Sequence, residues 1–462
     1  MNNYRIESDS LGNVQVPESA YYGAQTQRAF ENFPISDKRI PRSFIRALGL
    51  IKKAAAETNA ELELLDSKLA EAISKAAEEV IEGDYDDDFV VDIYQTGSGT
   101  SSNMNANEVI ANRAIELLGG ELGSKKPIHP NDHVNKGQSS NDVIPSAIHI
   151  AALETIENNL LPALTNLNTV LEEKAHEFDN TVKIGRTHLQ DAVPVRLGQE
   201  FSGYARQIEL SIERISRVKT RLRELALGGT AVGTGLNTHP DFAGMAIERI
   251  NQMTGLHFVE AENRFEALAS RDAAVETSGQ LKTIAISLMK IVNDLRWLSS
   301  GPRCGIGEIT LPSLQPGSSI MPGKVNPVIP ESIMMICATV IGNDAAISIG
   351  GQHGNFELNV MMPMIAYHLL DSISLLTNGA NNLVDKCVKG IVANSERAKS
   401  LIENSLAMCT ALAPHIGYDA AAKIAKKAYS SGKTVREIAE EEDVLPENKL
   451  KQLLDPMRQT GK

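Results

Sequence analysis

The stretch ARQIELSIERISRVKTRLREL, residues 205–225, decides the fold that we expect for this chain. Apolar residues recur in it at mostly three- and four-residue steps, which places one apolar stripe along a helix. The stretch GQLKTIAISLMKIVNDLRWL, residues 279–298, has the same spacing. The stripe positions are Ile208, Ile212, Ile215, Leu222 and Leu225 in the first stretch, and Leu281, Ile284, Leu288, Ile291 and Leu295 in the second. Helices with a single stripe must bury it against one another, so the pattern predicts a helical bundle.

The predicted bundle helices are long and nearly free of internal glycine and proline. They are separated by glycine-rich breaks such as LGGTAVGTGLNTHP, residues 227–240. At about 1.5 Å per residue, the helices reach about 40 Å, which is long for a compact monomer. This length predicts contacts between subunits.

We expect a mainly α chain of three domains. Residues 1–137 mix shorter helical patterns with loops, and residues 138–395 hold the long striped helices. Residues 396–462 predict a small C-terminal helical domain, in which Thr434 and Glu437 have the spacing of a capping box.

The composition of the 462 residues, with 42% hydrophobic and 22% charged side chains, is that of an ordinary globular protein. No run approaches the roughly 18 to 20 uncharged apolar residues of a membrane helix, and the first residues lack a basic region followed by an apolar one. We therefore expect a cytoplasmic protein. The net charge of -13 disfavours nucleic acid or an anionic membrane as a partner.

The four cysteines are widely spaced, with no CxxC pair. This spacing disfavours a zinc site, an iron–sulfur cluster and a disulfide framework. The sequence therefore predicts a reducing compartment and inert, buried thiols. The positions are Cys304, Cys337, Cys387 and Cys409.

Four small, polar, glycine-containing segments lie at predicted breaks between helices, at residues 96–105, 129–142, 185–194 and 317–331. A helical bundle assembles a small-molecule site by bringing such helix ends together. Neither GxxxxGK[ST] nor GxGxxG is present, so the segments do not indicate nucleotide binding.

The first two segments carry hydroxyl groups just before predicted helices. Ser98 and Thr100 precede a helix expected near Asn103, and residues 139–142 precede the next one. Helix N-termini attract anions through free N–H groups and partial positive charge. On these residues alone, ordinary N-capping is the favoured interpretation, because Ser and Thr cap helices in most proteins.

His188 lies in the third segment, after an arginine and a threonine. A lone histidine is often structural, and His129 and His239 are competing candidates for chemistry. The chain has no HExxH or other zinc spacing, so metal catalysis is not indicated.

The fourth segment is GSSIMPGKVNPVIPE, residues 317–331. A neutral serine is a poor base, but a nearby cation and amide donors can stabilise its alkoxide. Lys324 and the loop N–H groups provide these for Ser318 or Ser319, and Glu331 can orient a histidine. The alternative is a surface loop with a solvated lysine.

GSSIMPGKVNP resembles the signature of the fumarase/aspartase superfamily. Further segments resemble the class II, iron-independent fumarate hydratases: GSGTSSNMNANEVIANRA, HPNDHVNKGQSSND, KIGRTHLQDAVP, LALGGTAVGTGLNTHP, GPRCGIGEI and GNFELNV. The resemblance covers nearly the whole chain. It implies a three-domain, mostly helical subunit, and a homotetramer in which each active site takes segments from three chains.

The resemblance also implies a reaction of the tricarboxylic acid cycle, the reversible stereospecific hydration of fumarate to (S)-malate, without a metal or other cofactor. Ser318 would abstract the C3 proton, and His188, supported by Glu331, would protonate the departing hydroxyl. Lys324, Asn326 and loop amides would stabilise the resulting aci-carboxylate. In an alternative assignment, His188 is the base and a water or another group is the acid.

The residues that the resemblance implies for holding the substrate carboxylates are Ser98, Gly99, Thr100, Ser139, Ser140, Asn141, Thr187, Ser319, Lys324, Val325 and Asn326. A second, noncatalytic dicarboxylate site maps to His129, Pro130, Asn131 and Asp132. Lys126 replaces a common arginine beside it, and lysine lacks arginine's bidentate contact.

Two other functions compete with fumarate hydratase. Aspartate ammonia-lyases share the signature, but they usually carry Gln where His188 stands and Ala where Gly323 stands. A noncatalytic dicarboxylate-binding protein would bind without turnover. The complete set of Ser318, His188, Lys324, Asn326 and Glu331 speaks against the loss of catalysis.

Overall fold

A computed structural model describes residues 3–461. It confirms the mainly α fold: helices dominate, and the strands of the described residues form only two-stranded pairs. The chain divides into two compact units. Unit 1 comprises residues 1–162, 213–283 and 338–376, and unit 2 comprises residues 163–212, 284–337 and 377–462.

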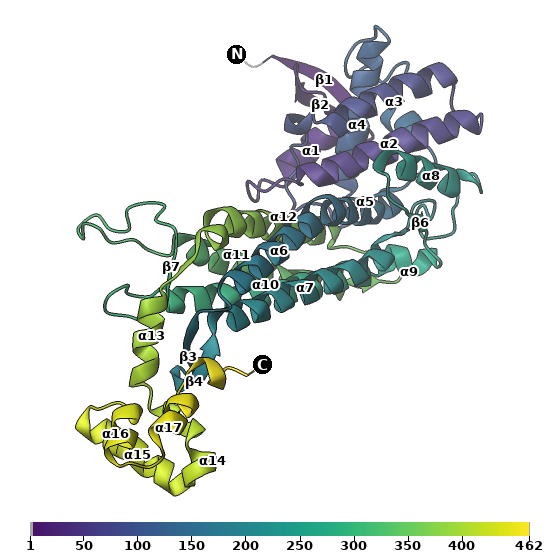
Figure 1. Ribbon diagram of the computed structural model, residues 1–462. Coiled ribbons are helices and arrows are strands. Elements are labelled where there is room, and N and C mark those ends of the chain that lie inside the picture. Colours follow the sequence, from purple (N-terminus) through teal and green to yellow (C-terminus); the bar gives the residue numbers. More distant parts are fainter. Residues whose placement is uncertain (1–2, 462) are drawn as a thin grey trace. The chain divides into compact units, whose positions relative to one another are not determined.

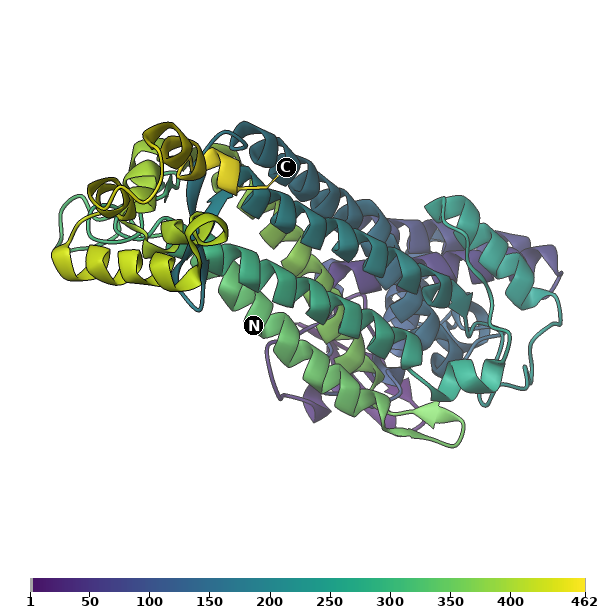
Figure 2. The same cartoon turned by 60° about the horizontal axis from the view of Figure 1, so that its bottom comes forward.

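The boundaries between the two units in the sequence fall within five long helices. They are α6 (Leu161–Glu177), α7 (Leu197–Leu222), α10 (Asp272–Leu298), α11 (Val328–Gly351) and α12 (Met362–Lys386). Figures 1 and 2 both show α7, α10 and α11 as long helices. All of the predicted stripe positions are buried except Ile212, which is half-buried. Leu225 is buried too, but it lies in a short strand beyond the end of α7.

Unit 1 contains seven shorter helices or helical segments besides its parts of the long helices. They are α1 (Ala24–Asn32), α2 (Arg42–Glu61), α3 (Ser67–Glu82), α4 (Thr100–Leu117), α5 (Ser140–Thr155), α8 (Phe242–Thr254) and α9 (Arg264–Ala269). Its strand pairs are β1 (Tyr4–Asp9) with β2 (Gly12–Pro17), β5 (Glu224–Leu225) with β6 (Val259–Glu260), and β8 (Gly354–Asn355) with β9 (Leu358–Asn359). The β5–β6 pair is parallel, and the other two are antiparallel.

Helices α2 and α3 pack against each other, and local signals set the ends of α3. The Asp66 carboxylate accepts hydrogen bonds from the N–H groups of Lys68 and Leu69, and Gly83 ends α3 in the left-handed conformation. Gly49 of α2 allows close packing, since a Cβ there would lie 2.9 Å from Cγ1 of Ile81. The apolar faces of both helices are buried in unit 1.

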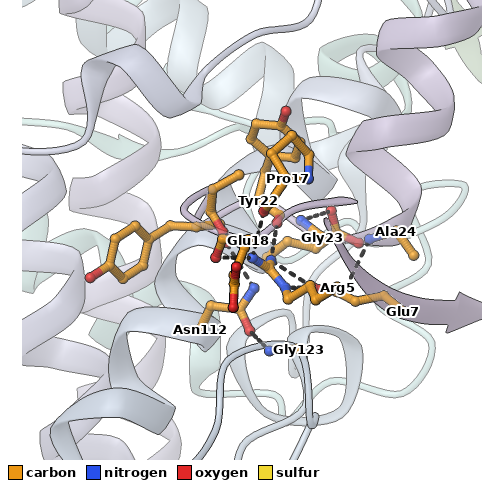
Figure 3. A network of polar contacts seen from close by, with 12 residues as sticks. Arg5, Glu7, Pro17, Glu18, Tyr22, Gly23, Ala24, Asn112 and Gly123 are labelled. Carbon is orange, nitrogen blue, oxygen red and sulfur yellow. Dashed lines mark hydrogen bonds and ion pairs between the residues drawn. The ribbon is translucent and has the colours of Figure 1, made fainter. Parts of the chain in front are cut away.

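The N-terminal hairpin β1–β2 is held by the side chain of Arg5 (Figure 3). The Arg5 guanidinium donates to the Glu7 carboxylate and to four carbonyl oxygens of the segment that follows β1. These carbonyl groups belong to Pro17, Glu18, Ala20 and Tyr22. No pattern in the sequence predicted this hairpin.

The start of α1 is held by the buried carboxylate of Glu108. It accepts from the N–H groups of Gly23, Gln25 and Thr26, which are free donors at a helix N-terminus. The Glu7 carboxylate accepts from the neighbouring Ala24 N–H at 3.1 Å, so the hairpin is tied to α1 as well.

Unit 2 contains two antiparallel strand pairs, β3 (Val182–Thr187) with β4 (Gln190–Arg196), and β7 (Ile309–Thr310) with β10 (Val392–Ala393). Its shorter helices are α13 (Ser395–Asn404), α14 (Ala413–Ile416), α15 (Tyr418–Ser431), α16 (Val435–Glu441) and α17 (Glu447–Leu453). Short 3₁₀ or π turns complete the two units at residues 86–88, 130–134, 156–160, 388–390, 406–411 and 457–459.

The small C-terminal helices surround a core of their own, which includes Ile402, Ile424, Ile438 and Leu450. The capping box of Thr434 and Glu437 is present at the start of α16, as predicted. The limits of three domains at 137/138 and 395/396 stay a prediction.

One helix of the described residues, α11, is long and apolar enough by length and composition to cross a membrane. Such a helix was not expected from the sequence. Core helices pass the same test, and α11 carries Asp344, which is buried and accepts hydrogen bonds from Lys282 (2.6 Å) and Ser278 (2.9 Å) within unit 1.

All four cysteines are free thiols. Cys337 and Cys387 are buried, and burial raises the pKa of each thiol to about 12. Cys409 is half-buried. The prediction of buried thiols is wrong for Cys304, which is exposed in the glycine-rich loop before β7.

Candidate active site

In unit 1, the starts of α4 and α5 lie together and are joined by hydroxyl groups. The Oγ of Ser98 lies 2.8 Å from Oγ1 of Thr100, which in turn lies 2.8 Å from Oγ of Ser140. Helix α4 begins at Thr100, three residues earlier than predicted, because Gly99 adopts a positive φ of 73° as its N-cap. The result is a cluster of hydroxyl and N–H donors at two helix N-termini, where a carboxylate is stabilised.

The start of α5 has a complete capping box. The Ser139 side chain accepts from N–H groups in the first turn, while the Asp142 carboxylate accepts from the Ser139 N–H at 2.9 Å. Asn141 donates through Nδ2 to the carbonyl oxygen of Ala231 at 2.8 Å. Ser140 and Thr100 remain half-exposed beside the capped turns.

In unit 2, Thr187 and His188 lie at the turn of the β3–β4 hairpin, where an irregular break between helices was expected. Thr187 pairs with Gln190, so His188 and Leu189 form a two-residue turn. Both have positive φ, 55° and 59°, as turns of this type require. The His188 side chain is exposed, and within residues 3–461 it forms no hydrogen bond or ion pair.

A buried ion network holds the hairpin one residue before Thr187. The two carboxylate oxygens of Glu308 accept from the Arg186 guanidinium at 2.9 and 3.1 Å. The Lys183 ammonium lies 3.3 Å from Glu308 and 2.8 Å from Glu200. Burial raises the pKa of Glu200. This network gives the strand before His188 a fixed position in unit 2.

The loop of residues 317–327 folds back on itself before α11. The Gly317 N–H donates to the Lys324 carbonyl at 2.7 Å, and Asn326 Nδ2 donates to the Gly317 carbonyl at 2.8 Å. The Ser318 Oγ accepts from the N–H groups of Ile320 (3.2 Å) and Met321 (3.0 Å). A cavity of about 450 Å³ lies on this loop, lined by residues that include Ser318, Lys324 and Val325.

Glu331 lies in the first turn of α11. Within one chain, the described residues show neither a hydrogen bond nor an ion pair between Glu331 and His188. Ser319 and Lys324 are exposed. Asn326 is occupied by the Gly317 carbonyl, so it supports the loop in this structure.

The residues of the predicted second site form a tight turn in unit 1. Nδ1 of His129 accepts from the N–H groups of Asn131 (3.2 Å) and Asp132 (3.3 Å), and it lies 3.5 Å from the Asp132 carboxylate. Pro130 is buried, and Lys126 is exposed. Among residues 3–461, no group of three or more His, Cys, Asp or Glu side chains is arranged to hold a metal ion.

Comparison with known proteins places the chain in a family. A model of a lyase family, described as "Lyase", matches residues 12–342, and a model described as "Fumarase C C-terminus" matches residues 408–461. The protein named "Fumarate hydratase class II" of Nitrosomonas europaea is 55% identical over 439 residues, which are 95% of each chain. The chain belongs to the class II fumarate hydratase family. The "Fumarate hydratase, mitochondrial" of Rattus norvegicus is 54% identical over 100% of this chain and 91% of its own length.

The fold of the class II fumarate hydratase family is also confirmed by solved structures. The crystal structure of recombinant class II fumarase from Schistosoma mansoni has a TM-score of 0.96 and 43% identity, and it covers 99% of both chains. A crystal structure of fumarate lyase:delta crystallin from Brucella melitensis, bound to cobalt, has a TM-score of 0.95 and 47% identity over 100% of both chains.

Sequence reasoning missed the buried residues that hold the segments of the predicted site in place. Arg186 was noted only as the neighbour of His188, and Glu308 was not singled out. A glutamate in a glycine-rich loop gives no periodic signal. Lys52 was missed as well, although one signal was available, since it interrupts the apolar face of α2.

Proposed function

We propose that this chain catalyses the reversible, stereospecific hydration of fumarate to (S)-malate. The observation that carries the proposal is the hydroxyl cluster of Ser98, Thr100 and Ser140 at two helix N-termini. The chain that carries this cluster is 55% identical to a protein named fumarate hydratase class II. Such a cluster suits a carboxylate, and the substrate is a dicarboxylate.

The chemical difficulty is the removal of a proton beside a carboxylate, because negative charge then accumulates on that group. Preorganised donors must lie where the charge develops. In the proposal, Lys324, Asn326 and the amide of Val325, all in the loop of residues 317–327, stabilise this negative charge. The exposed ammonium of Lys324 and the adjoining cavity support this assignment.

Ser318 is proposed as the base that abstracts the C3 proton. Two backbone N–H groups donate to its Oγ, from Ile320 and Met321. Hydrogen bonds to an oxygen favour its charged form, so this arrangement supports an alkoxide at Ser318.

His188 is proposed as the acid that protonates the departing hydroxyl, with Glu331 as its supporting carboxylate. His188 and Glu331 do not contact each other within one chain. In the proposal, His188 of one subunit therefore contacts Glu331 of another subunit of the homotetramer. Thr187, Ser319 and the unit 1 residues Gly99, Ser139 and Asn141 complete the proposed carboxylate contacts. The assignment of His188 as base, with a water or another group as acid, remains the alternative.

We also propose a homotetramer with active sites shared between subunits, no nucleic acid or membrane partner, and a cytoplasmic location. The exposed apolar face of α11, with Met335 at 66% and Ile349 at 56% exposure, supports the association of subunits. His129, Pro130, Asn131 and Asp132 remain proposed as a second dicarboxylate site.

The function is tested by following fumarate absorbance with purified protein. We expect fumarate to form from (S)-malate and to be consumed in the reverse direction, with rates unchanged by a chelator. Deamination of aspartate without any action on malate would show an aspartate ammonia-lyase instead. Saturable fumarate binding without turnover would show a noncatalytic binding protein.

The site is tested by Ser318→Ala and His188→Asn. Each removes one acid–base step, so we expect kcat to fall by roughly a hundred- to ten-thousandfold. Matched controls are Ser400→Ala and His176→Asn, which remove the same groups from exposed positions in α13 and α6. An unchanged kcat in Ser318→Ala would remove serine from the role of base.

A further inference from the structure

Lys52 is a fully buried lysine on α2 whose three hydrogen-bond acceptors are neutral. Its side chain has 0% exposure. Nζ donates to Oδ1 of Asn103 at 2.8 Å, Oδ1 of Asn135 at 3.0 Å and Oε1 of Gln138 at 2.9 Å. Buried ammonium groups are costly and are normally paired with carboxylates. Its hydrogen-bond partners therefore leave the charge of Lys52 uncompensated.

The three acceptors belong to the two segments that form the hydroxyl cluster. Asn103 lies in the first turn of α4, three residues after Thr100. Gln138 directly precedes Ser139, the N-cap of α5. Asn135 contacts both, since its Oδ1 accepts from Nδ2 of Asn103 and its Nδ2 donates to the Gln138 carbonyl, each at 3.1 Å. One ammonium group thus joins both helix starts from the buried side.

Asp142 is the charged group whose electrostatic field acts on Lys52, and it too supports the cluster. Its carboxylate accepts from the N–H groups of Ser139 (2.9 Å), Gly228 (3.0 Å) and Thr230 (2.9 Å). The groups from α4 and residues 135–138 that contact Lys52 are uncharged amides.

Burial gives both groups unusual acid–base properties. It lowers the pKa of Lys52 to about 7, against a smaller opposite effect of Asp142. It raises the pKa of Asp142 to about 6, against the effect of its backbone donors. Near pH 7 the charge of Lys52 therefore depends on what else binds nearby, and a dianion at the helix starts favours its protonated form.

We propose that Lys52 is a positioning residue of the dicarboxylate site, which holds the starts of α4 and α5 together and favours the dianionic substrate by its buried positive charge. The inference rests on the proposed function, because it takes the hydroxyl cluster as the place of a substrate carboxylate. It assigns Lys52 no contact with the substrate.

The test is Lys52→Met, which keeps the length and apolar stem of the side chain but removes the charge. We expect KM for fumarate to rise at least about tenfold at pH 6.5, with a smaller change in kcat, since the interaction acts on binding. The control is Lys53→Met, the next residue of α2, which loses an equal charge from a partly exposed ion pair with Glu78. We expect Lys53→Met to keep the wild-type KM.

The pH profile separates this role from a merely structural one. In the wild type, kcat/KM reports the free enzyme, so we expect it to fall as Lys52 loses its proton above about pH 7. In Lys52→Met this fall should be absent. In the isosteric Gln138→Glu, a carboxylate beside Lys52 favours the ammonium, so the fall should move upward by about one pH unit or more.

Binding of succinate, a saturated dicarboxylate, gives a readout that does not need turnover. By titration calorimetry we expect Lys52→Met to bind succinate at least about tenfold more weakly than Lys53→Met. If the wild type binds succinate but hydrates no fumarate, the proposed function fails while this comparison still tests Lys52.

A folded Lys52→Met with unchanged KM, unchanged succinate affinity and an unchanged pH profile would overturn the inference. If Lys52→Met does not fold, Gln138→Glu decides instead, because it leaves Lys52 in place. A pH profile of Gln138→Glu identical to that of the wild type would then overturn the inference as well.

Discussion

At the scale of single residues, His149 shows how burial sets the response of this protein to acid. Its Nδ1 lies 2.7 Å from the carbonyl oxygen of Glu224, which can only accept, so Nδ1 carries the proton. Burial, and to a lesser degree the charge of Arg271, lowers the pKa of His149 to about 4. The neutral imidazole is therefore the form compatible with the fold.

This pKa predicts a loss of stability in mild acid. The unfolded chain binds a proton at His149 below pH 6.5, whereas the folded chain does so only near pH 4. The stability associated with the neutral imidazole is thus complete above pH 6.5 and is lost as the pH falls towards 4. At pH 5 the loss is about 2 kcal/mol.

His149→Gln cannot take up a proton, so we expect its free energy of unfolding to change less between pH 7 and pH 5 than that of the wild type. Urea denaturation at both pH values measures this difference. His176→Gln, at an exposed position, should follow the wild type. Equal pH responses of wild type and His149→Gln would contradict a neutral imidazole at this half-buried position.

Residue chemistry was the most predictable part of the candidate site. The place of Ser98, Thr100 and Ser140 before helices left capping and anion binding open, the family resemblance predicted a substrate role, and the structure joins their hydroxyl groups. Lys52 and Lys53 are adjacent and chemically identical in the sequence, yet one is buried and the other pairs with Glu78. The place of Lys52 on the apolar face of α2 is the one sequence signal that separates them, and its partners in α4 and residues 135–138 are visible only in the structure.

At the scale of elements, the helices were predictable and the hairpins were not. The stripe of residues 281–295 repeats over several turns of α10, whereas β3 and β4 are six and seven residues long and lack a clear alternation. The turn at His188 and Leu189 also lacks glycine, although both residues have positive φ. Long-range contacts to Glu308 stabilise this hairpin, and such contacts leave no local pattern.

The hairpin gives a prediction for Glu308→Gln. The glutamine removes the charge that Arg186 and Lys183 share, so the Arg186 guanidinium loses its carboxylate partner and Lys183 loses one of two. We expect the free energy of unfolding to fall by about 3 kcal/mol or more. We also expect faster hydrogen exchange in residues 182–196 and a lower kcat, because His188 loses its fixed position.

Mass-spectrometric hydrogen exchange and steady-state kinetics measure both effects. The control is Glu209→Gln, which breaks an ion pair with Arg206 in the same unit whose two side chains are both exposed. An exposed pair contributes about 0.5 kcal/mol, so this variant should retain stability, exchange and kcat. Wild-type exchange in the hairpin of Glu308→Gln would show that the network does not hold His188.

At the scale of the whole molecule, the long helices support the proposal that one chain is not the complete unit. Along α11, exposed small or apolar residues recur at alternating three- and four-residue steps, at Met335, Ala338, Gly342, Ala345 and Ile349. This is the spacing of a seam between packed helices. Small residues in the middle of the seam allow close approach of a neighbouring helix.

We therefore expect Ile349→Arg to dissociate the proposed tetramer, since it places a charge in the seam where a second copy of the chain would pack. Sedimentation velocity measures the mass, and the fumarate assay measures activity on the same samples. Activity should fall together with the tetramer, because His188 and Glu331 do not meet within one chain. Leu11→Arg, at an exposed leucine in the β1–β2 turn, should leave both mass and activity unchanged. A fully active monomer of Ile349→Arg would contradict the sharing of active sites between subunits, and it would require His188 to act without Glu331.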